Sequence, residues 1–425
     1  MKVIEQIYQL YSQNHIISTD SRKIIPGCVF VALKGEHFDG NDFAYQVAKD
    51  NVAACVIADR KDLPSHERLF IVENSLTTLQ ELAKLHRERI KIPVIGITGT
   101  NGKTTTKELI STVLSQKFNI IYTQGNFNNH LGVPLTLLQI KPDTEIAVVE
   151  MGANHPKEIE LLCSIAQPDY GIITNIGKAH IEGFGSFQGV INTKKELYDY
   201  LKNKNGKIFL NNDNLLLKEI SSGLSNITYG KNDDADCHAS ISSSNPYLSV
   251  VWNDSEINTK LVGDYNFENV MAAISVGCYF NIEKNLIIRA LEDYSPTNNR
   301  SQFIKTQKNE IVMDAYNANP VSMYHSIRNF KNISDEKHLL IIGDMKELGQ
   351  DSSDEHIEII KLIRQLNFND VILVGTEFSK TESGFLSFLN VDELISYLNE
   401  NEISGKKILI KGSHSIHLEK IVSLL

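Results

Sequence analysis

The sequence predicts an α/β protein of three domains, in which helices cover mainly parallel sheets. Short apolar runs alternate with longer helical patterns along most of the 425 residues. One apolar run leads directly into a glycine-rich loop, which is common where a strand of a parallel sheet is followed by a helix. The length allows about two to four domains, and a hydrophobic content of 42% is enough for each of them to bury a core.

Composition narrows the class of protein further. The net charge of −10 argues against a general nucleic-acid binder, because no basic stripe offsets the acidic balance. The five cysteines lie far apart without a CxxC pair, so neither a disulfide framework nor a zinc site is predicted. The stretch MKVIEQIYQLYSQNH has an amphipathic helical pattern, and no apolar run approaches the roughly 18 residues of a membrane span. We therefore expect a cytoplasmic protein that binds no membrane.

Residues 1–90 are expected to form a small α/β domain. Turn signals such as Lys34-Gly35 and Phe38-Asp39-Gly40 separate its apolar runs, and a helical stretch at 77–89 leads into the next domain. The strands are expected at residues 29–33, 53–58 and 69–72.

Residues 91–301 are expected to form a larger domain around a parallel sheet. Its first strand, at 92–95, enters the glycine-rich stretch GITGTNGKTTTK at 96–107. Apolar residues at three- and four-residue spacing then predict a helix over 105–116. Further strands are expected at residues 120–123, 145–150, 170–175 and 207–211.

The glycine-rich loop predicts binding of a nucleoside triphosphate. Its backbone N–H groups can converge on phosphate oxygens, and the following helix directs the positive end of its dipole at them. Lys103 would add a positive charge near the β- and γ-phosphates, and the Thr104 hydroxyl an oxygen ligand for Mg²⁺. The loop departs from the general P-loop pattern, because Ile97 stands where that pattern has its first glycine. An ordinary strand-to-helix turn is the alternative reading.

Two side chains at strand ends are candidates for a metal site. Glu150 ends the strand at 145–150, and carboxyl ends of parallel strands are where ligands gather in open α/β sheets. Its carboxylate could hold Mg²⁺ directly or through water, or it could be a solvated surface acid. His180 follows the next strand, but Mg²⁺ prefers oxygen, so from spacing alone a hydrogen-bonded structural histidine is the commoner case.

Lys194 and Lys195 lie on an expected helix over 190–201. Adjacent lysines on a helix usually form a solvated face. A buried lysine near a metal can instead become a carbamate, which supplies an anionic ligand. The sequence chemistry leaves both readings open.

Residues 302–425 are expected to form a doubly wound domain of about 120 residues, within the usual domain size. Helical patterns separate its short apolar strands. These strands are expected at residues 311–314, 339–343, 371–374 and 407–410.

Several motifs in register resemble the Mur ligase family, the ATP-dependent amide-forming enzymes of peptidoglycan precursor synthesis. The resemblance covers nearly the whole chain. Stretches at 125–138, 314–320 and 343–349 are most similar to the member that adds D-alanyl-D-alanine to UDP-N-acetylmuramoyl tripeptide. The motifs that carry the resemblance are GTNGKTT, GNFNNHLGVPLTLL, EMGAN, NIGKAHIEGFGS, GDYNFENVMAA, the Asn298-Asn299-Arg300 turn, DAYNANP and GDMKELG.

The resemblance implies a UDP-binding first domain, a central P-loop ATPase and a Rossmann-like third domain. ATP and Mg²⁺ would be the cofactors, and the tripeptide carboxylate would form an acyl phosphate that the dipeptide amine then attacks. It further implies phosphate contacts from Gly99, Thr100, Asn101, Gly102, Lys103, Thr104 and Thr105; nucleotide contacts from Asn269, Arg300 and Asp314; metal contacts from Thr104, Glu150, His180 and a carbamoylated Lys194; catalytic roles for Lys103, Lys194 and His180; and substrate contacts from Ser21, Arg22, Asp39, Gly40, Asn128 and Asn129.

Two positions depart from the family pattern. Tyr265 replaces a frequent histidine, and His414 replaces a common arginine whose two-pronged carboxylate contact an imidazole cannot make. A sibling ligase that adds a single amino acid, a folylpolyglutamate-type ligase and a catalytically inactive nucleotide-binding scaffold are the alternatives. A monomer is expected, whereas the third peptide residue, diaminopimelate or lysine, and the relative domain orientation stay open.

Overall fold

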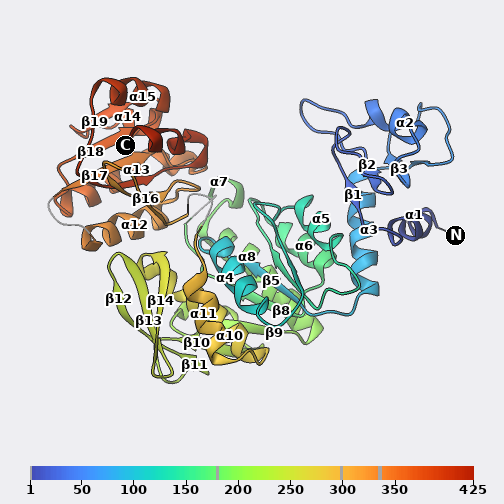
Figure 1. Ribbon diagram of the computed structural model, residues 1–425, viewed down its shortest axis with the longest axis horizontal. Helices are drawn as coiled ribbons and strands as arrows, with labels where there is room; N and C mark the ends of the chain where they lie inside the picture. Colours follow the sequence, from blue (N-terminus) through green and yellow to red (C-terminus); the bar gives the residue numbers. More distant parts are fainter. Residues whose placement is uncertain (1, 179–180, 297–299, 334–336) are drawn as a thin grey trace.

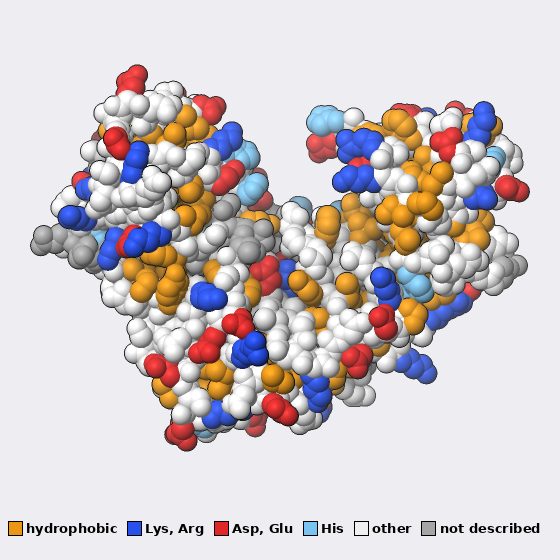
Figure 2. Space-filling view, in the orientation of Figure 1, with side chains coloured by type: hydrophobic (Ala, Val, Ile, Leu, Met, Phe, Trp, Pro, Cys, Tyr) orange, Lys and Arg blue, Asp and Glu red, His pale blue; other side chains and the backbone are white. Residues whose placement is uncertain are grey.

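The computed structural model describes residues 2–178, 181–296, 300–333 and 337–425. Their strands form four sheets, arranged in an N-terminal, a central and a C-terminal lobe (Figure 1). The two terminal lobes stand on either side of the central lobe, and Figure 2 shows a deep hollow between them. Among the described helices, none combines the length and the apolar composition that crossing a lipid bilayer requires.

The N-terminal lobe is a four-stranded parallel sheet in the order β1-β2-β3-β4. Alternate residues of β2 and β3 point to opposite faces, where α1 and α3 cover one face and α2 the other. The three predicted strands and the predicted helix are confirmed, and the short β1 is an addition. The elements are α1 (Val3–Tyr11), β1 (Ile17–Ser18), β2 (Val29–Val31), α2 (Asn41–Lys49), β3 (Cys55–Ala58), β4 (Leu69–Ile71) and α3 (Ser75–Arg89).

The central lobe contains a seven-stranded sheet in the order β11-β10-β9-β8-β5-β7-β6, with all its pairs parallel, as predicted. The glycine-rich loop joins the interior strand β5 to α4. Its elements are β5 (Val94–Thr98), α4 (Lys103–Leu114), β6 (Ile120–Tyr122), α5 (Gly132–Leu137), β7 (Ile146–Glu150), α6 (Glu158–Ala166), β8 (Tyr170–Ile173), α7 (Ile181–Phe184), α8 (Phe187–Lys204), β9 (Lys207–Asn211), α9 (Leu215–Ile220), β10 (Ser225–Gly230) and β11 (Cys237–His238).

Both faces of this sheet are covered, which explains its continuous apolar strands. Ala147 and Val149 of β7 join a core formed with α5, α6 and α8, whereas Ile146 and Val148 join a second core on the other face. The first core continues into α1 and α3, so the N-terminal lobe shares a hydrophobic core with the central one. Because all the strands of the sheet run parallel, their carboxyl ends lie at one edge of it.

A three-stranded antiparallel sheet, in the order β12-β13-β14, extends the second face and was not predicted from the sequence. Serines and other polar residues alternate there with buried Leu248, Val250 and Ile257. The chain then returns through two helices that pack against α4. These elements are β12 (Ser240–Ser244), β13 (Tyr247–Trp252), β14 (Ser255–Val262), α10 (Phe267–Tyr279) and α11 (Lys284–Asp293).

The C-terminal lobe is a six-stranded sheet in the order β15-β16-β20-β17-β18-β19, covered by helices on both faces. Its pairs are parallel except β15 with β16. The predicted strands form β16, β17, β18 and β20. The elements are β15 (Gln302–Lys305), β16 (Glu310–Asp314), α12 (Pro320–Ile333), β17 (His338–Gly343), α13 (Ser352–Gln365), β18 (Val371–Val374), α14 (Thr376–Ser379), β19 (Leu386–Phe388), α15 (Val391–Glu400) and β20 (Lys407–Lys411).

Candidate active site

A cavity of about 1040 Å³ lies at the carboxyl ends of β5, β7 and β8 and extends to the C-terminal lobe. Most of the predicted site residues line it, although they come from distant parts of the chain. Those residues are Gly99, Thr100, Asn101, Gly102, Lys103, Thr104, Thr105, Asn128, Asn129, Glu150, Lys194, Asn269, Arg300 and Asp314. His180, Asn298 and Asn299 lie outside the described residues.

Two glycines in the loop between β5 and α4 have conformations and neighbours that other residues would not tolerate. Gly99 has a φ of 144°, and a Cβ atom there would lie 2.0 Å from the Thr174 hydroxyl oxygen. Gly102 has a φ of 79° and lies against the side-chain amide of Asn269 on α10. The loop is therefore clamped between β8 and α10, with its backbone exposed to the cavity where phosphates could approach.

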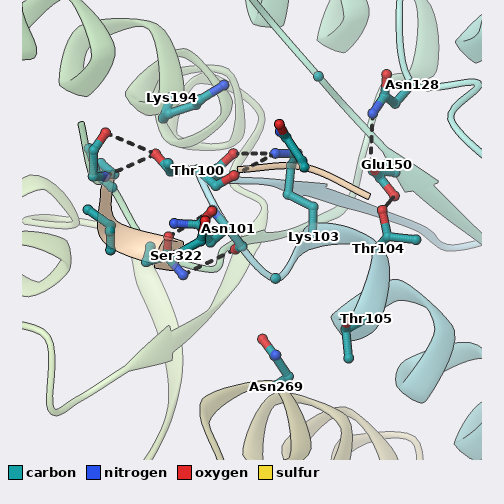
Figure 3. A pocket seen from close by; sticks show the side chains of 18 of the residues that line it. Thr100, Asn101, Lys103, Thr104, Thr105, Asn128, Glu150, Lys194, Asn269 and Ser322 are labelled. Atoms are coloured by element: carbon teal, nitrogen blue, oxygen red, sulfur yellow. Dashed lines mark hydrogen bonds between the residues drawn. The ribbon is translucent and has the colours of Figure 1, made fainter. Parts of the chain in front are cut away.

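Lys103 is the first residue of α4 and folds back over the loop. Its ammonium group donates hydrogen bonds to the carbonyl oxygens of Gly99, at 2.8 Å, and Thr100, at 2.9 Å (Figure 3). Burial lowers the pKa of Lys103, and the carboxylate of Glu150 opposes that shift. The ammonium group is thus poised on the loop, within the cavity that a triphosphate would occupy.

Glu150 is the last residue of β7 and is 1% exposed. One carboxylate oxygen accepts a hydrogen bond from the Thr104 hydroxyl at 2.8 Å, and the other accepts one from the Asn128 amide at 2.8 Å (Figure 3). The ammonium group of Lys107, one turn along α4, lies 3.8 Å from Glu150. Sequence reasoning missed Lys107. Its place one turn after Lys103 is the signal that could have identified it.

The side-chain oxygen atoms of Thr104 and Glu150 suit a Mg²⁺ ion better than a metal ion whose ligands all come from protein side chains. No group of three or more His, Cys, Asp or Glu side chains that could hold a metal ion occurs in the described residues. Mg²⁺ usually binds one or two protein oxygen ligands together with phosphate oxygens and water. The buried Thr104–Glu150 pair beside the phosphate loop matches that donor set.

Lys194 is buried on α8, although its neighbour Lys195 forms an exposed ion pair with Asp199. The Lys194 ammonium nitrogen lies 3.5 Å from the carbonyl oxygen of Ala153 and 5.4 Å from the centre of the Phe184 ring. Burial, and secondarily the charge of Lys103, lowers the pKa of Lys194 to about 7. A large fraction of this amine is therefore neutral, and hence nucleophilic, near neutral pH.

The turn into the C-terminal lobe closes another side of the cavity. The Arg300 guanidinium lies 3.7 Å from the centre of the Tyr316 ring, and Asp314 accepts a hydrogen bond from Lys411 at 2.6 Å. Tyr265, at a position that departs from the family pattern, hydrogen-bonds to the Ser301 hydroxyl at 2.8 Å. Lys411 ends β20, a strand end that sequence reasoning did not use.

Two predicted asparagines are already held by other parts of the central lobe. The Asn269 carbonyl accepts a hydrogen bond from Thr106, and its amide donates one to Asn266, both at 2.9 Å. The Asn129 carbonyl accepts from the backbone N–H groups of Leu131 and Gly132 at the start of α5. Both side chains are oriented by the protein before any ligand binds.

The predicted residues of the N-terminal lobe are not among those lining this cavity. Ser21 and Arg22 lie in the turn after β1, where Arg22 forms a two-pronged pair with Asp20. Asp39 accepts hydrogen bonds from Asn41 and Arg60, and a Cβ atom on Gly40 would lie 2.9 Å from the backbone of Ala32 and Leu33. The N-terminal lobe, which carries these residues, stands across the hollow of Figure 2 from the C-terminal lobe.

Comparison with known proteins assigns the chain to a family. Residues 13–96 match the catalytic domain of the Mur ligase family, residues 97–277 the Mur ligase middle domain, and residues 299–414 the Mur ligase glutamate ligase domain. The chain belongs to the Mur ligase family. The resemblance seen in the motifs is thereby confirmed, as is the three-domain α/β fold.

Individual relatives within the Mur ligase family match over nearly their whole length. The UDP-N-acetylmuramoyl-tripeptide–D-alanyl-D-alanine ligase of Bacillus subtilis is 35% identical over 96% of this chain and 92% of that protein. The Escherichia coli enzyme of the same name is 31% identical over 96% and 93%. A crystal structure of MurF from Acinetobacter baumannii is 28% identical, with a TM-score of 0.86 over 98% and 97% of the two chains. MurF ligase from Thermotoga maritima, solved in complex with ADP, is 29% identical, with a TM-score of 0.84 over 100% and 98%.

Proposed function

We propose that this chain is an ATP-dependent ligase that adds D-alanyl-D-alanine to UDP-N-acetylmuramoyl tripeptide in peptidoglycan precursor synthesis. The observation that carries the proposal is one cavity lined by the phosphate loop with Lys103, by the Thr104–Glu150 pair and by the buried Lys194. The names of relatives that match over more than nine-tenths of both chains support the choice of substrates.

The reaction has two steps. An oxygen of the tripeptide carboxylate forms a bond to the γ-phosphorus of ATP while the bond from that phosphorus to the bridging oxygen breaks, which yields an acyl phosphate and ADP. The amino nitrogen of the dipeptide then bonds to the acyl carbon, phosphate leaves, and the nitrogen loses a proton. Anionic groups must approach one another in the first step, so charge neutralisation and positioning supply most of the catalysis.

The loop residues 99–105 would hold the phosphates through backbone N–H groups, and the Lys103 ammonium would exchange its loop carbonyl partners for phosphate oxygens. Thr104 and Glu150 would hold Mg²⁺, which supplies positive charge to the reacting phosphate. Asn128, which is hydrogen-bonded to Glu150, would orient that carboxylate. Together with Asn129 it would also contact the muramoyl substrate. His180 would complete the metal site.

Lys194 would act as a carbamate. Its neutral amine can add to carbon dioxide with loss of one proton, because burial holds its pKa near neutrality, at about 7. The product is an anion that can balance a nearby cation. The ordinary alternative, a solvated lysine, does not fit a side chain that is 3% exposed.

The remaining site residues would contact the nucleotide and the UDP group. Arg300 and Asp314 would contact the nucleotide where the third domain, residues 302–425, joins the central domain, residues 91–301, and Asn269 would contact the adenine. The first domain, residues 1–90, would bind the UDP group through Ser21, Arg22, Asp39 and Gly40. We further propose a cytoplasmic monomer that acts on these small molecules and binds neither nucleic acid nor membrane.

The test is phosphate release from ATP by the purified protein with Mg²⁺ and UDP-muramoyl tripeptide, with and without D-alanyl-D-alanine. We expect release that depends on the dipeptide and a pentapeptide product detected by mass. Release with lysine, meso-diaminopimelate or glutamate instead would indicate a sibling ligase. ATP binding without release for any of these amines would indicate an inactive scaffold.

A further inference from the structure

Asn319, in the segment between β16 and α12, reaches from the C-terminal lobe to the phosphate loop. Its amide nitrogen donates a hydrogen bond to the Asn101 side-chain oxygen at 2.7 Å, and the Asn101 amide nitrogen lies 3.5 Å from the Asn319 side-chain oxygen. Asn319 is 6% exposed, so water competes little for this contact. An amide pair therefore joins two segments 218 residues apart.

The Asn319 side chain is oriented by the start of α12. Its carbonyl oxygen accepts a hydrogen bond from the Ser322 backbone N–H at 2.9 Å, and the Ser322 hydroxyl accepts one from the Asn319 backbone N–H at 3.1 Å. This is the arrangement of a helix N-cap, followed by Pro320 at the first helical position. Since the cap engages the carbonyl, the amide nitrogen is left to face the loop.

Asn101 is also held by hydrogen bonds within the central lobe. Its backbone N–H donates to the Asn175 side-chain oxygen at 2.9 Å, and its carbonyl accepts from the Thr174 hydroxyl at 2.6 Å. The loop apex is thus tied to the end of β8 by its backbone and to α12 by its side chain. A shift of the C-terminal lobe would act directly on the residue before Gly102 and Lys103.

We propose that Asn319 is a positioning residue that couples the C-terminal lobe to the phosphate loop, so that the loop holds its nucleotide-binding shape when the lobe is docked. The inference rests on the proposed ligase function, because it assigns the loop to ATP. Asn319 acts through Asn101 and touches no reacting group. The Lys178–Glu355 ion pair between the same lobes, at 3.5 Å, carries less of this coupling, because the lysine side chain is exposed and solvent screens its charge.

The test uses Asn319→Ser, because serine retains the helix cap but is too short to reach Asn101. Asn390→Ser is the matched control, since Asn390 caps α15 in the same lobe by accepting from the Glu393 N–H at 3.0 Å. We expect Asn319→Ser to lower kcat/KM for ATP about two- to tenfold, the range for loss of one neutral hydrogen bond. Its melting temperature without nucleotide should match that of the control, whereas the rise in melting temperature on adding ADP should be smaller.

A double-mutant cycle with Asn101→Ala separates coupling from a merely structural role. If the amide pair is the link, the double variant loses no more activity than the more impaired single variant. Two results would overturn the inference. One is a double variant whose loss of kcat/KM equals the product of the two single-variant losses. The other is an Asn319→Ser enzyme whose kcat/KM and ADP-induced rise in melting temperature equal those of Asn390→Ser. Wild-type protein without dipeptide-dependent phosphate release would instead contradict the proposed function, so the two failures are distinguishable.

Discussion

Replacing Lys194 with methionine should stabilise the protein while abolishing ligation. The lysine is buried and its pKa falls from 10.5 to about 7 on folding. Below pH 7 the folded state must bury an ammonium group, whereas between pH 7 and 10.5 the unfolded chain binds more protons than the folded one. The stability of the wild type therefore rises with pH across that window.

The size of the effect follows from the shift. A difference of 3.5 pKa units, from 10.5 to about 7, corresponds to about 5 kcal/mol at low pH, of which about 4 kcal/mol remains at pH 7 and about 2 kcal/mol at pH 9. Methionine is similar in length and carries no charge, so it should fill the same space without the penalty. We expect Lys194→Met to exceed the wild type in stability by up to about 4 kcal/mol at pH 7, and by about 2 kcal/mol less at pH 9.

The assay is urea unfolding at pH 7 and pH 9, in buffer freed of carbon dioxide so that the amine stays unmodified. Lys195→Met is the matched control, because that neighbouring side chain is only partly buried and pairs with the exposed Asp199. The control should follow the wild type at both pH values. Parallel pH dependence of the wild type and Lys194→Met, or a less stable Lys194→Met at pH 7, would refute the reasoning about burial. Full ligase turnover in Lys194→Met would remove the residue from the mechanism.

Three further predictions concern the phosphate loop and its carboxylate partner. Lys103→Ala should lower kcat, measured as steady-state phosphate release, by roughly 10²- to 10³-fold, because a preorganised positive charge is lost. A much smaller decrease in kcat would contradict this role. Glu150→Gln should raise the Mg²⁺ concentration needed for half-maximal activity by about tenfold or more, since it removes an anionic oxygen ligand; an unchanged Mg²⁺ titration would argue against the metal site. Gly102→Ala should destabilise the protein by about 1–2 kcal/mol in urea unfolding, because φ is 79° and the new Cβ atom would lie 2.5 Å from the Asn269 side-chain oxygen. Unchanged stability would show that Asn269 on α10 can move away from the new Cβ atom.

Local patterns in the sequence were sufficient to predict most of the strands and helices. Continuous apolar strands such as Val94–Thr98 and Ile146–Glu150 indicate a sheet buried on both faces, and the glycine loop between strand and helix indicates a phosphate site. The antiparallel strands Ser240–Ser244 and Tyr247–Trp252 escaped prediction, because the first consists mostly of serines and the second has apolar residues on both of its faces, so neither shows a clear period-two signal.

The family, the order of the domains and the chemical types of the site residues can be deduced without a structure, because each of these is written in short contiguous motifs. Tertiary structure alone decided which lysines are buried and which side chains meet across lobes. Lys194 and Lys195 are neighbours on one helix, yet only the packing of α8 against the central sheet buries the first and lowers its pKa. The contact between Asn101 and Asn319 likewise depends on the placement of two lobes. Burial and long-range contact are properties of the whole packed chain, so no local stretch of sequence can encode them.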